Sequence, residues 1–291
     1  MNDGRNCACE LPTIFTEQES EVARRRTVSR VDNMPPGSPN SIMPDRPRHF
    51  VHLYALCWNE ERLLPFFFHH YDPFVTHYFI FDHDSNDRSR EILKSHPHVT
   101  LGKFEVGGDS YVSSACDFYD HAWKESRGGA DWVIICNIDA HLEHPDFAGL
   151  FDRARKSGAT IFGSEGFEMI TASFPKETAP LCQQTRRGWR SEVLDKVSIF
   201  NPNAIREIDY GRGRHECTPQ GHVMWAAERV RLLHYKYLGL DYLQQRMAEL
   251  GARRLAGDIR ENLDHHYDTT AAQLAEIYRV KIETASPIDS N

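Results

Sequence analysis

The sequence has no long apolar run, no excess of positive charge and no even set of cysteines. Its segments fall short of the roughly 18 consecutive apolar residues that a membrane-spanning helix needs. The polar start MNDGRNCACE lacks the apolar region of a signal peptide. We therefore expect a cytoplasmic protein without a transmembrane segment, for which only transient membrane contact stays open.

The charge balance argues against a nucleic-acid partner. The formal net charge is -8 at pH 7, whereas phosphate backbones bind to clustered positive fields. The seven cysteines are odd in number and scattered, which favours reduced thiols over a disulfide framework. Cys7 and Cys9 form a lone C-x-C without a second pair at zinc spacing nearby, so we favour an unstructured tail over a metal site there.

Composition divides the chain into three regions. Residues 1–47 combine scattered charges, the run Arg24 to Arg26 and a stretch rich in Pro, Ser and Asn. Such a composition does not offset the entropy lost on ordering, so we expect a disordered leader. Residues 48–250 hold the apolar runs of one folded domain. Residues 251–291 carry amphipathic patterns and are predicted as a C-terminal helical extension.

Strand and helix patterns alternate in the first half of the folded domain. The strand candidates are short apolar runs, and helical periodicity follows each of the first three. The alternation predicts right-handed βαβ units and an α/β fold with a mostly parallel central sheet flanked by helices. The strand candidates are residues 49–58, 77–81, 98–104 and 131–136.

Patterns after residue 140 are looser. They predict a helix at 145–156, strands at 159–163, 196–200 and 229–238, and a glycine-rich segment at 211–222. The R-R-x-W-R series at 186–190 is interpreted as a flexible loop, which either closes over a substrate or is an ordinary surface loop.

Polar residues follow successive strand candidates. Ligands of wound α/β sheets gather beyond the carboxyl ends of the strands, so this position predicts a binding site. The residues concerned are Asn59, Glu60, Asp82, Asp84, Asp87, Asn137 and Asp139.

Asn137 and Asp139 follow the most apolar strand candidate and flank Ile138. Strand-like alternation would direct both polar side chains to one side. Carboxylate and amide oxygens suit Mg²⁺ or Mn²⁺, and His234, at the end of a later apolar run, would add an imidazole ligand. Lys236 would place positive charge near a diphosphate. A turn or helix cap after the strand stays open as the alternative for Asn137 and Asp139.

Four motifs in order resemble GT-A-fold glycosyltransferases of the family-2 type. They are A-L-C-W-N-E-E-x-L-L-P-F-F-x-x-H-Y, F-I-F-D-H-D-S-N-D-x-S-x-E-I-L, D-W-V-I-I-C-N-I-D-A-H-L and H-Y-K-Y. The resemblance covers about residues 50 to 250. It is closest to the branch whose domain opens with N-E-x-x-x-L-P-x-x-x-x-H-Y.

The resemblance implies a GT-A fold and roles for particular residues. Asn137 and Asp139 match the metal-binding D-x-D, with asparagine in the first place, and His234 matches the histidine that completes the metal site. Residues 58–60 would line the nucleotide pocket. The other nucleotide-side residues are the base-contacting Asp82 and, in the adjoining loop, Asp84. For Asp84 and Asp87, capping of the next helix stays open as the alternative. The branch usually has Glu and an aromatic residue after the second aspartate, whereas this chain has Ala140 and His141.

The expected activity is sugar transfer, with hexose as the default, from a nucleotide-diphosphate sugar to a glycan, lipid or other hydroxyl acceptor. The resemblance implies an inverting, Mn²⁺- or Mg²⁺-dependent enzyme. Glu165 and His215 are the candidates for the general base that such a transfer needs. Two alternatives stay open. One is a catalytically silent nucleotide- or sugar-binding module, which the asparagine at 137 supports. The other is a nucleotidyltransferase, which W-N-E-E after the first strand disfavours because a glycine-rich phosphate loop is expected there.

Overall fold

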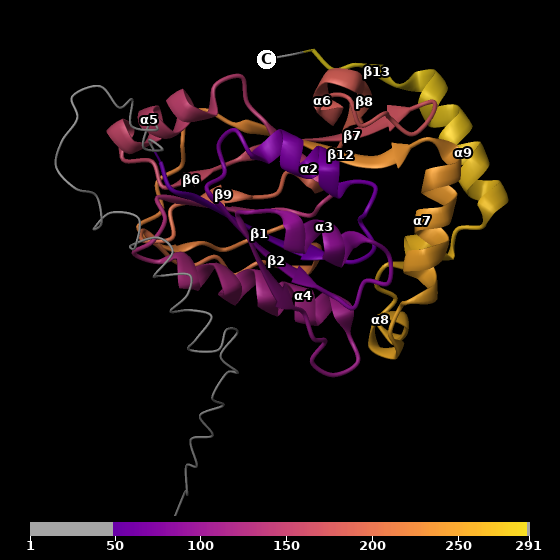
Figure 1. Ribbon diagram of the computed structural model, residues 1–291, viewed down its shortest axis with the longest axis horizontal. Coiled ribbons are helices and arrows are strands. Elements are labelled where there is room, and N and C mark those ends of the chain that lie inside the picture. Colours follow the sequence, from indigo (N-terminus) through magenta and orange to yellow (C-terminus); the bar gives the residue numbers. More distant parts are fainter. Residues whose placement is uncertain (1–48, 290–291) are drawn as a thin grey trace, which may run out of the picture. The chain divides into compact units, whose positions relative to one another are not determined.

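The computed structural model describes residues 49–289 (Figure 1), and the leader expected at 1–47 lies outside them. The described residues belong to one compact unit and form a mixed α/β fold with two main sheets. Among residues 49–289, no helix is both long and apolar enough to cross a bilayer.

The first sheet has the strand order β3-β2-β1-β4-β9-β6. Its first four strands are parallel, as the βαβ alternation predicts. The last two are short, and β9 is antiparallel to both β4 and β6. The bounds are β1 Val51–Cys57, β2 His77–Asp82, β3 Val99–Lys103, β4 Trp132–Ile135, β6 Ile161–Phe162 and β9 Ile199–Phe200.

A second sheet, which the sequence patterns do not separate from the first, has the order β13-β8-β7-β12-β5. Only β7 and β12 are parallel to each other. The series at 186–190 is therefore not a loop, because Arg187–Arg190 form β8 and pair with β7. The bounds are β5 Ala140–Glu143, β7 Ser164–Thr171, β8 Arg187–Arg190, β12 Val230–Leu238 and β13 Ser286–Pro287. A small two-stranded ribbon joins β10 Ile205–Glu207 to β11 Gln220–Gly221.

Helices connect and cover the sheets, and side chains cap the N-termini of α4 and α5. Ser110 caps the N-terminus of α4, and Asp146 caps α5, which ends at Gly158 in the left-handed conformation. The bounds in this part are α2 Leu64–Tyr71, α3 Ser89–Ser95, α4 Tyr111–His121, η1 Ala122–Ser126, α5 Phe147–Ser157, α6 Leu181–Gln184, η2 Glu192–Leu194 and η3 Arg212–Arg214.

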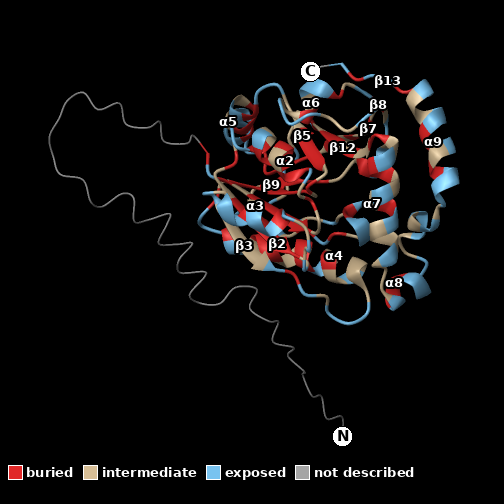
Figure 2. Cartoon of the chain, turned by 45° about the vertical axis from the view of Figure 1, so that its right-hand side comes forward, coloured by how far each residue is buried: buried red, intermediate tan, exposed pale blue. Residues whose placement is uncertain are grey.

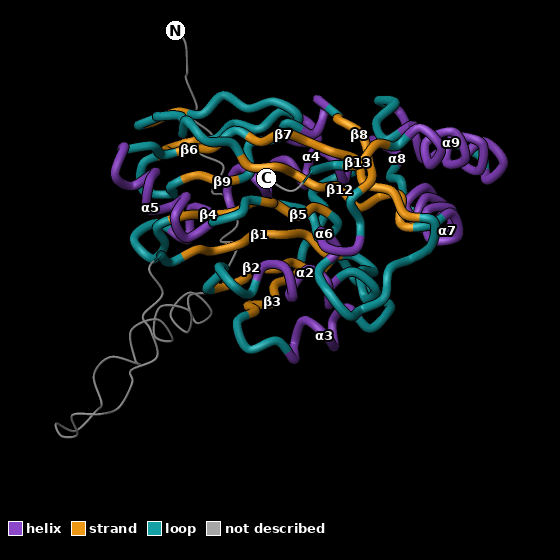
Figure 3. Tube along the Cα trace, turned by 90° about the horizontal axis from the view of Figure 1, so that it is seen from above, coloured by secondary structure: helices purple, strands orange, loops and turns teal. Residues whose placement is uncertain are grey.

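The C-terminal helices gather at one end of the sheets (Figures 1 and 3). The buried Asp258 of α8 joins them to α4, since its carboxylate accepts hydrogen bonds from the Ser110 hydroxyl and from the Tyr111 and Val112 amides. The bounds are α7 Leu240–Ala252, α8 Ala256–Arg260, η4 His265–Asp268 and α9 Ala271–Thr284. Residues 251–289 thus pack on the domain while α9 keeps an exposed outer face (Figure 2).

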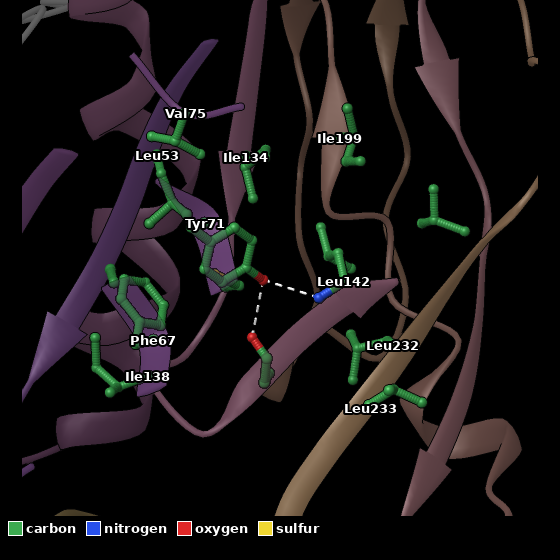
Figure 4. Packing of buried hydrophobic residues seen from close by; sticks show 14 of the residues in the cluster. Leu53, Phe67, Tyr71, Val75, Ile134, Ile138, Leu142, Ile199, Leu232 and Leu233 are labelled. Carbon is green, nitrogen blue, oxygen red and sulfur yellow. Dashed lines mark hydrogen bonds between the residues drawn. The ribbon is translucent and has the colours of Figure 1, made fainter. Parts of the chain in front are cut away.

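One apolar core runs between the two sheets (Figure 4). Tyr71, at the end of α2, is fully buried in it, and its hydroxyl donates to the Ala140 carbonyl at 3.0 Å and accepts from the Leu142 amide at 2.9 Å. Ile138, 1% exposed, enters the same core. These contacts fix the start of β5 and, with it, the preceding turn that contains Asp139.

Candidate functional site

Asp139 and His234, which are 95 residues apart in sequence, meet where the chain passes from the first sheet to the second. The Nε2 atom of His234 lies 3.1 Å from Oδ2 of Asp139. Asp139 is in the turn between β4 and β5, and His234 is in β12 opposite Ala140. The Tyr235 amide also donates to the Asp139 carbonyl at 2.8 Å. Backbone pairing and side-chain contact therefore hold this pair together.

Glu168 is a third member of the cluster that the sequence patterns did not identify. Its Oε2 lies 2.9 Å from Nδ1 of His234, and the two residues are opposite each other in β7 and β12. Carboxylates commonly orient histidines that ligate metals in this way. The sequence contained a signal, because Glu168 is one of only two charged residues, with Glu165, in the strand-length run SEGFEMIT at 164–171.

The two carboxylates keep the imidazole protonated. Burial alone would lower the pKa of His234, but Glu168 and Asp139 outweigh burial and raise this pKa to about 10. Burial likewise opposes the charge of Asp139, and here His234, with Arg246 and Lys196 nearby, lowers the pKa of Asp139 below its ordinary value. The cluster Glu168–His234–Asp139 is thus a chain of charges, negative, positive and negative, at neutral pH.

Asn137 contacts different groups from Asp139. The turn, in which the Ala140 amide donates to the Asn137 carbonyl, replaces the strand-like alternation expected over Asn137 to Asp139. The Asn137 Oδ1 atom instead faces the Tyr119 hydroxyl at 3.3 Å and a guanidinium nitrogen of Arg214 at 3.4 Å. This amide oxygen therefore already has donors.

The residues fit a divalent cation in part. Oδ1 of Asp139 is buried and has no hydrogen-bond partner among the described residues, so it is free to ligate. Two ligands of one octahedral ion, each about 2.1 Å from it, lie about 3 Å apart, which matches the contact of Asp139 with His234. However, within residues 49–289 no group of three or more His, Cys, Asp or Glu side chains is arranged to hold a metal. A metal ligated by His234 would also displace its proton.

The residues after β1 make contacts that join loops and helices. Asn59 has positive φ, and its side-chain amide both donates to and accepts from Asn86. Glu60 is buried and forms an ion pair with Arg246 of α7. Trp58 lies under the guanidinium of Arg253, 3.8 Å from the ring centroid. The structure thus brings α7 across the end of β1, where the nucleotide pocket is expected. A cleft there is lined by residues of both parts, including Asn59, Glu60, Tyr242 and Arg246.

Asp82, the last residue of β2, is 1% exposed. Its Oδ2 accepts from Arg90 at 3.1 Å and from the Ser85 amide at 3.2 Å, whereas its buried Oδ1 has no partner among the described residues. Asp82 is thus a buried carboxylate with one free oxygen at the expected edge of the sheet. Asp84 is exposed and has positive φ.

Two lysines lie near the Glu168–His234–Asp139 cluster. Lys236 interacts electrostatically with Glu168 and Asp139, and burial lowers its pKa. Lys196, which the sequence patterns did not identify, does the same, and burial and Arg214 lower its pKa to about 7. Both lysines add positive charge near the cluster, of the kind that attracts a diphosphate.

The two candidates for the general base lie in different places. Glu165 lies three residues before Glu168 in β7, so strand alternation directs the two side chains to opposite faces. Its partner is Arg229, at 4.0 Å, and the structure does not bring it to Asp139. His215 follows η3 and is exposed, and its Nδ1 donates to the Val193 carbonyl at 2.7 Å. Burial and Lys196 lower the pKa of His215, so His215 lies within electrostatic range of Lys196, whereas Asp139 is not among the groups that shift this pKa.

No protein-family model matches this chain, and no curated protein matches it in sequence. Among solved structures, glucosyl-3-phosphoglycerate synthase from Mycobacterium tuberculosis, in complex with Mn²⁺, UDP and glucosyl-3-phosphoglycerate, is 14% identical at a TM-score of 0.29, over 41% of this chain and 44% of that chain. S. aureus TarS 1–349 is 10% identical at a TM-score of 0.36, over 78% of this chain and 70% of that chain. The match thus spans less than half of the synthase chain. At these TM-scores neither likeness bears on the site.

Proposed function

We propose that this chain is a glycosyltransferase that moves a sugar, hexose by default, from a nucleotide-diphosphate sugar to a hydroxyl acceptor on a glycan, lipid or other molecule. The observation that carries the proposal is the 3.1 Å contact between Asp139 and His234. It lies at the carboxyl edge of four parallel strands, where ligands of such sheets bind. The inverting outcome is proposed from the family resemblance alone.

The chain's own residues supply the charges that the transfer needs. Departure of a nucleoside diphosphate leaves negative charge on the leaving oxygens, which cations on the protein stabilise. Lys236 is near enough to Asp139 to interact with it, and it is proposed as one such cation. Mn²⁺ or Mg²⁺, held by Asp139 and His234, would add Lewis-acid stabilisation of the same charge. Glu168 is proposed to orient His234 for that task.

On the nucleotide side, Asp82 is proposed to accept a hydrogen bond from the base through its unpartnered Oδ1. Trp58 and Asp84 are proposed to border the base. Asn59 and Glu60 are proposed to shape the pocket through their contacts with Asn86 and Arg246.

His215 is the better supported of the two general-base candidates. Because Nδ1 donates to the Val193 carbonyl, Nε2 of the neutral ring carries the lone pair that accepts a proton. The lowered pKa of His215 keeps the ring neutral at pH 7. Gly213 leaves room for this ring, since a Cβ there would lie 2.6 Å from Nε2.

The test is hydrolysis of a panel of nucleotide sugars by the wild type and by Asp139→Ala. We expect the variant to lose at least about a hundredfold in rate, a usual scale for loss of one group that stabilises transition-state charge. Asp117→Ala is the matched control, because Asp117 is exposed on α4 and its only ion pair among the described residues is with His121. Equal rates for the wild type and Asp139→Ala would refute the proposed role of Asp139.

The alternative of a catalytically silent nucleotide- or sugar-binding module has one observation in its favour. Asn137 stands in the first place of the metal-binding motif, and its amide oxygen already faces Tyr119 and Arg214. A silent module would bind nucleotides, measured as a thermal shift, yet release no sugar from any donor in the panel.

A further inference from the structure

Arg214 is a buried cation without an acidic partner. It is 4% exposed, yet no carboxylate among residues 49–289 forms an ion pair with its guanidinium. Its guanidinium lies 2.8 Å from the Ile135 carbonyl and 3.4 Å from Asn137 Oδ1, and it stacks on the rings of Tyr119 and Tyr210, 4.6 and 5.7 Å from their centroids. A buried charge without a counter-charge lowers the stability of the fold, so we expect Arg214 to have a functional role.

The backbone of Arg214 is also held in an uncommon conformation. Gly213 has φ 66° and Arg214 has φ 60°, so two consecutive residues are left-handed, which a residue with a Cβ adopts rarely. This turn directs the Arg214 side chain inward to Asn137, whereas Arg212 is exposed and pairs with Glu261, the residue after α8.

Lys196 is a second cation of the same kind. It is partly buried, and among the described residues its ammonium makes neither a hydrogen bond nor an ion pair within 4.0 Å. Its electrostatic neighbours include Arg214, which repels it, and Asp139, which attracts it. Neither cation forms an ion pair within 4.0 Å among residues 49–289, although Asp139, Glu168 and Asp264 attract Lys196 over longer distances. Both cations lie on the side of Asn137 and Asp139, where positive charge favours an anionic ligand.

We propose that Arg214 and Lys196 form a pair of cations that binds the diphosphate of the donor without a divalent metal. This inference rests on the proposed function, which it deepens. Asn137 is part of the arrangement, because an aspartate at 137 would neutralise Arg214, whereas the neutral amide accepts its hydrogen bond and leaves the charge for the ligand. The pair compensates for the incomplete metal ligand set at Asp139 and His234.

The experiment uses the full chain in EDTA, with inorganic pyrophosphate as the probe and thermal stability and calorimetry as readouts. Ligands that bind only the native state raise its apparent stability. We expect pyrophosphate to stabilise the wild type in EDTA. We expect Lys196→Met and Arg214→Gln each to weaken its affinity about tenfold or more, the scale for losing one charged contact. Arg212→Gln, in the same loop, is the matched control and should bind as the wild type does.

Ligand-free stability separates a binding role from a structural one. If Lys196 serves to bind a ligand, its repulsion with Arg214 destabilises the ligand-free protein. Lys196→Met then raises the melting temperature of the ligand-free protein and weakens its binding of pyrophosphate. A lower melting temperature with unchanged binding would show a structural lysine and overturn the proposal. Lys196→Met also keeps the test valid if Arg214→Gln fails to fold.

The outcomes distinguish this inference from the proposed function. If pyrophosphate and the donor nucleotide bind only when Mn²⁺ is added, the metal-free pair is refuted and the glycosyltransferase proposal stands. If the wild type binds pyrophosphate in EDTA but hydrolyses no nucleotide sugar with or without metal, the cation pair stands as an anion site and the proposed function fails.

Discussion

Individual residues in the Glu168–His234–Asp139 cluster have different tasks. Asp139 has a free carboxylate oxygen for a ligand, whereas Glu168 contacts His234 on the ring nitrogen away from Asp139. Glu168 is therefore a positioning residue, which acts by fixing the charge and orientation of the imidazole.

Glu168→Gln tests this task without any assay of sugar transfer. The variant keeps a hydrogen-bond acceptor at His234 but removes the negative charge that most strongly raises the pKa of His234. We expect the pKa to fall from about 10 by about one to three units, as measured by an NMR titration of the imidazole in metal-free protein. Glu165→Gln, on the opposite face of β7, is the control. Equal shifts in both variants, or none in Glu168→Gln, would contradict the assignment.

At the scale of elements, the site depends on how β5 is attached to α2. Asp139 immediately precedes β5, and the hydroxyl of Tyr71 bridges the Ala140 carbonyl and the Leu142 amide (Figure 4). Because the hydroxyl both donates and accepts a hydrogen bond in an apolar core, it restricts the movement of β5 and of the turn before it.

Tyr71→Phe is expected to lower the free energy of unfolding by about 1 to 3 kcal/mol, because two buried backbone groups lose their partner. Urea denaturation measures this difference. Tyr237→Phe is the matched control, since the hydroxyl of Tyr237 makes no hydrogen bond among residues 49–289, and it should change stability little. A loss in Tyr71→Phe no larger than that in the control would show that the bridge does not stabilise β5.

At the scale of the whole molecule, the burial of charged Lys196 beside Arg214 opposes folding in the absence of a ligand. The groups that face Lys196 are Arg214, Asp139, Glu168 and Asp264, and burial and Arg214 lower its pKa from 10.5 to about 7. Between these two values the unfolded chain holds a proton on Lys196 that the folded chain does not. The contribution of Lys196 to the free energy of unfolding therefore rises with pH between about 7 and 10.5.

Lys196→Met removes this dependence. Relative to the wild type, the variant should be most stabilised below about pH 7, where the folded wild type carries the full penalty of a charged Lys196. The difference should shrink steadily toward pH 10.5. Chemical denaturation of both proteins at several pH values measures it. A difference that stays constant with pH would show that Lys196 titrates normally in the folded chain.

The sequence alone determined the parallel half of the fold and the edge at which polar residues collect. Apolar runs at 49–58, 77–81, 98–104 and 131–136 are local signals, and β1 to β4 lie within them, apart from Asp82, which ends β2. The place of Asp139 after β4 follows from the same pattern.

Only the tertiary structure decided which further side chains lie near Asp139 and His234. Glu168, Arg214 and Arg246 reach the site through strand pairing, a left-handed turn and the packing of α7, respectively, none of which leaves a periodic pattern in the sequence. The division into two sheets was equally hidden, because short strands such as β5 and β8 gain their stability from neighbours distant in the chain. Long-range pairing, rather than local propensity, turned separate motifs into one charged site.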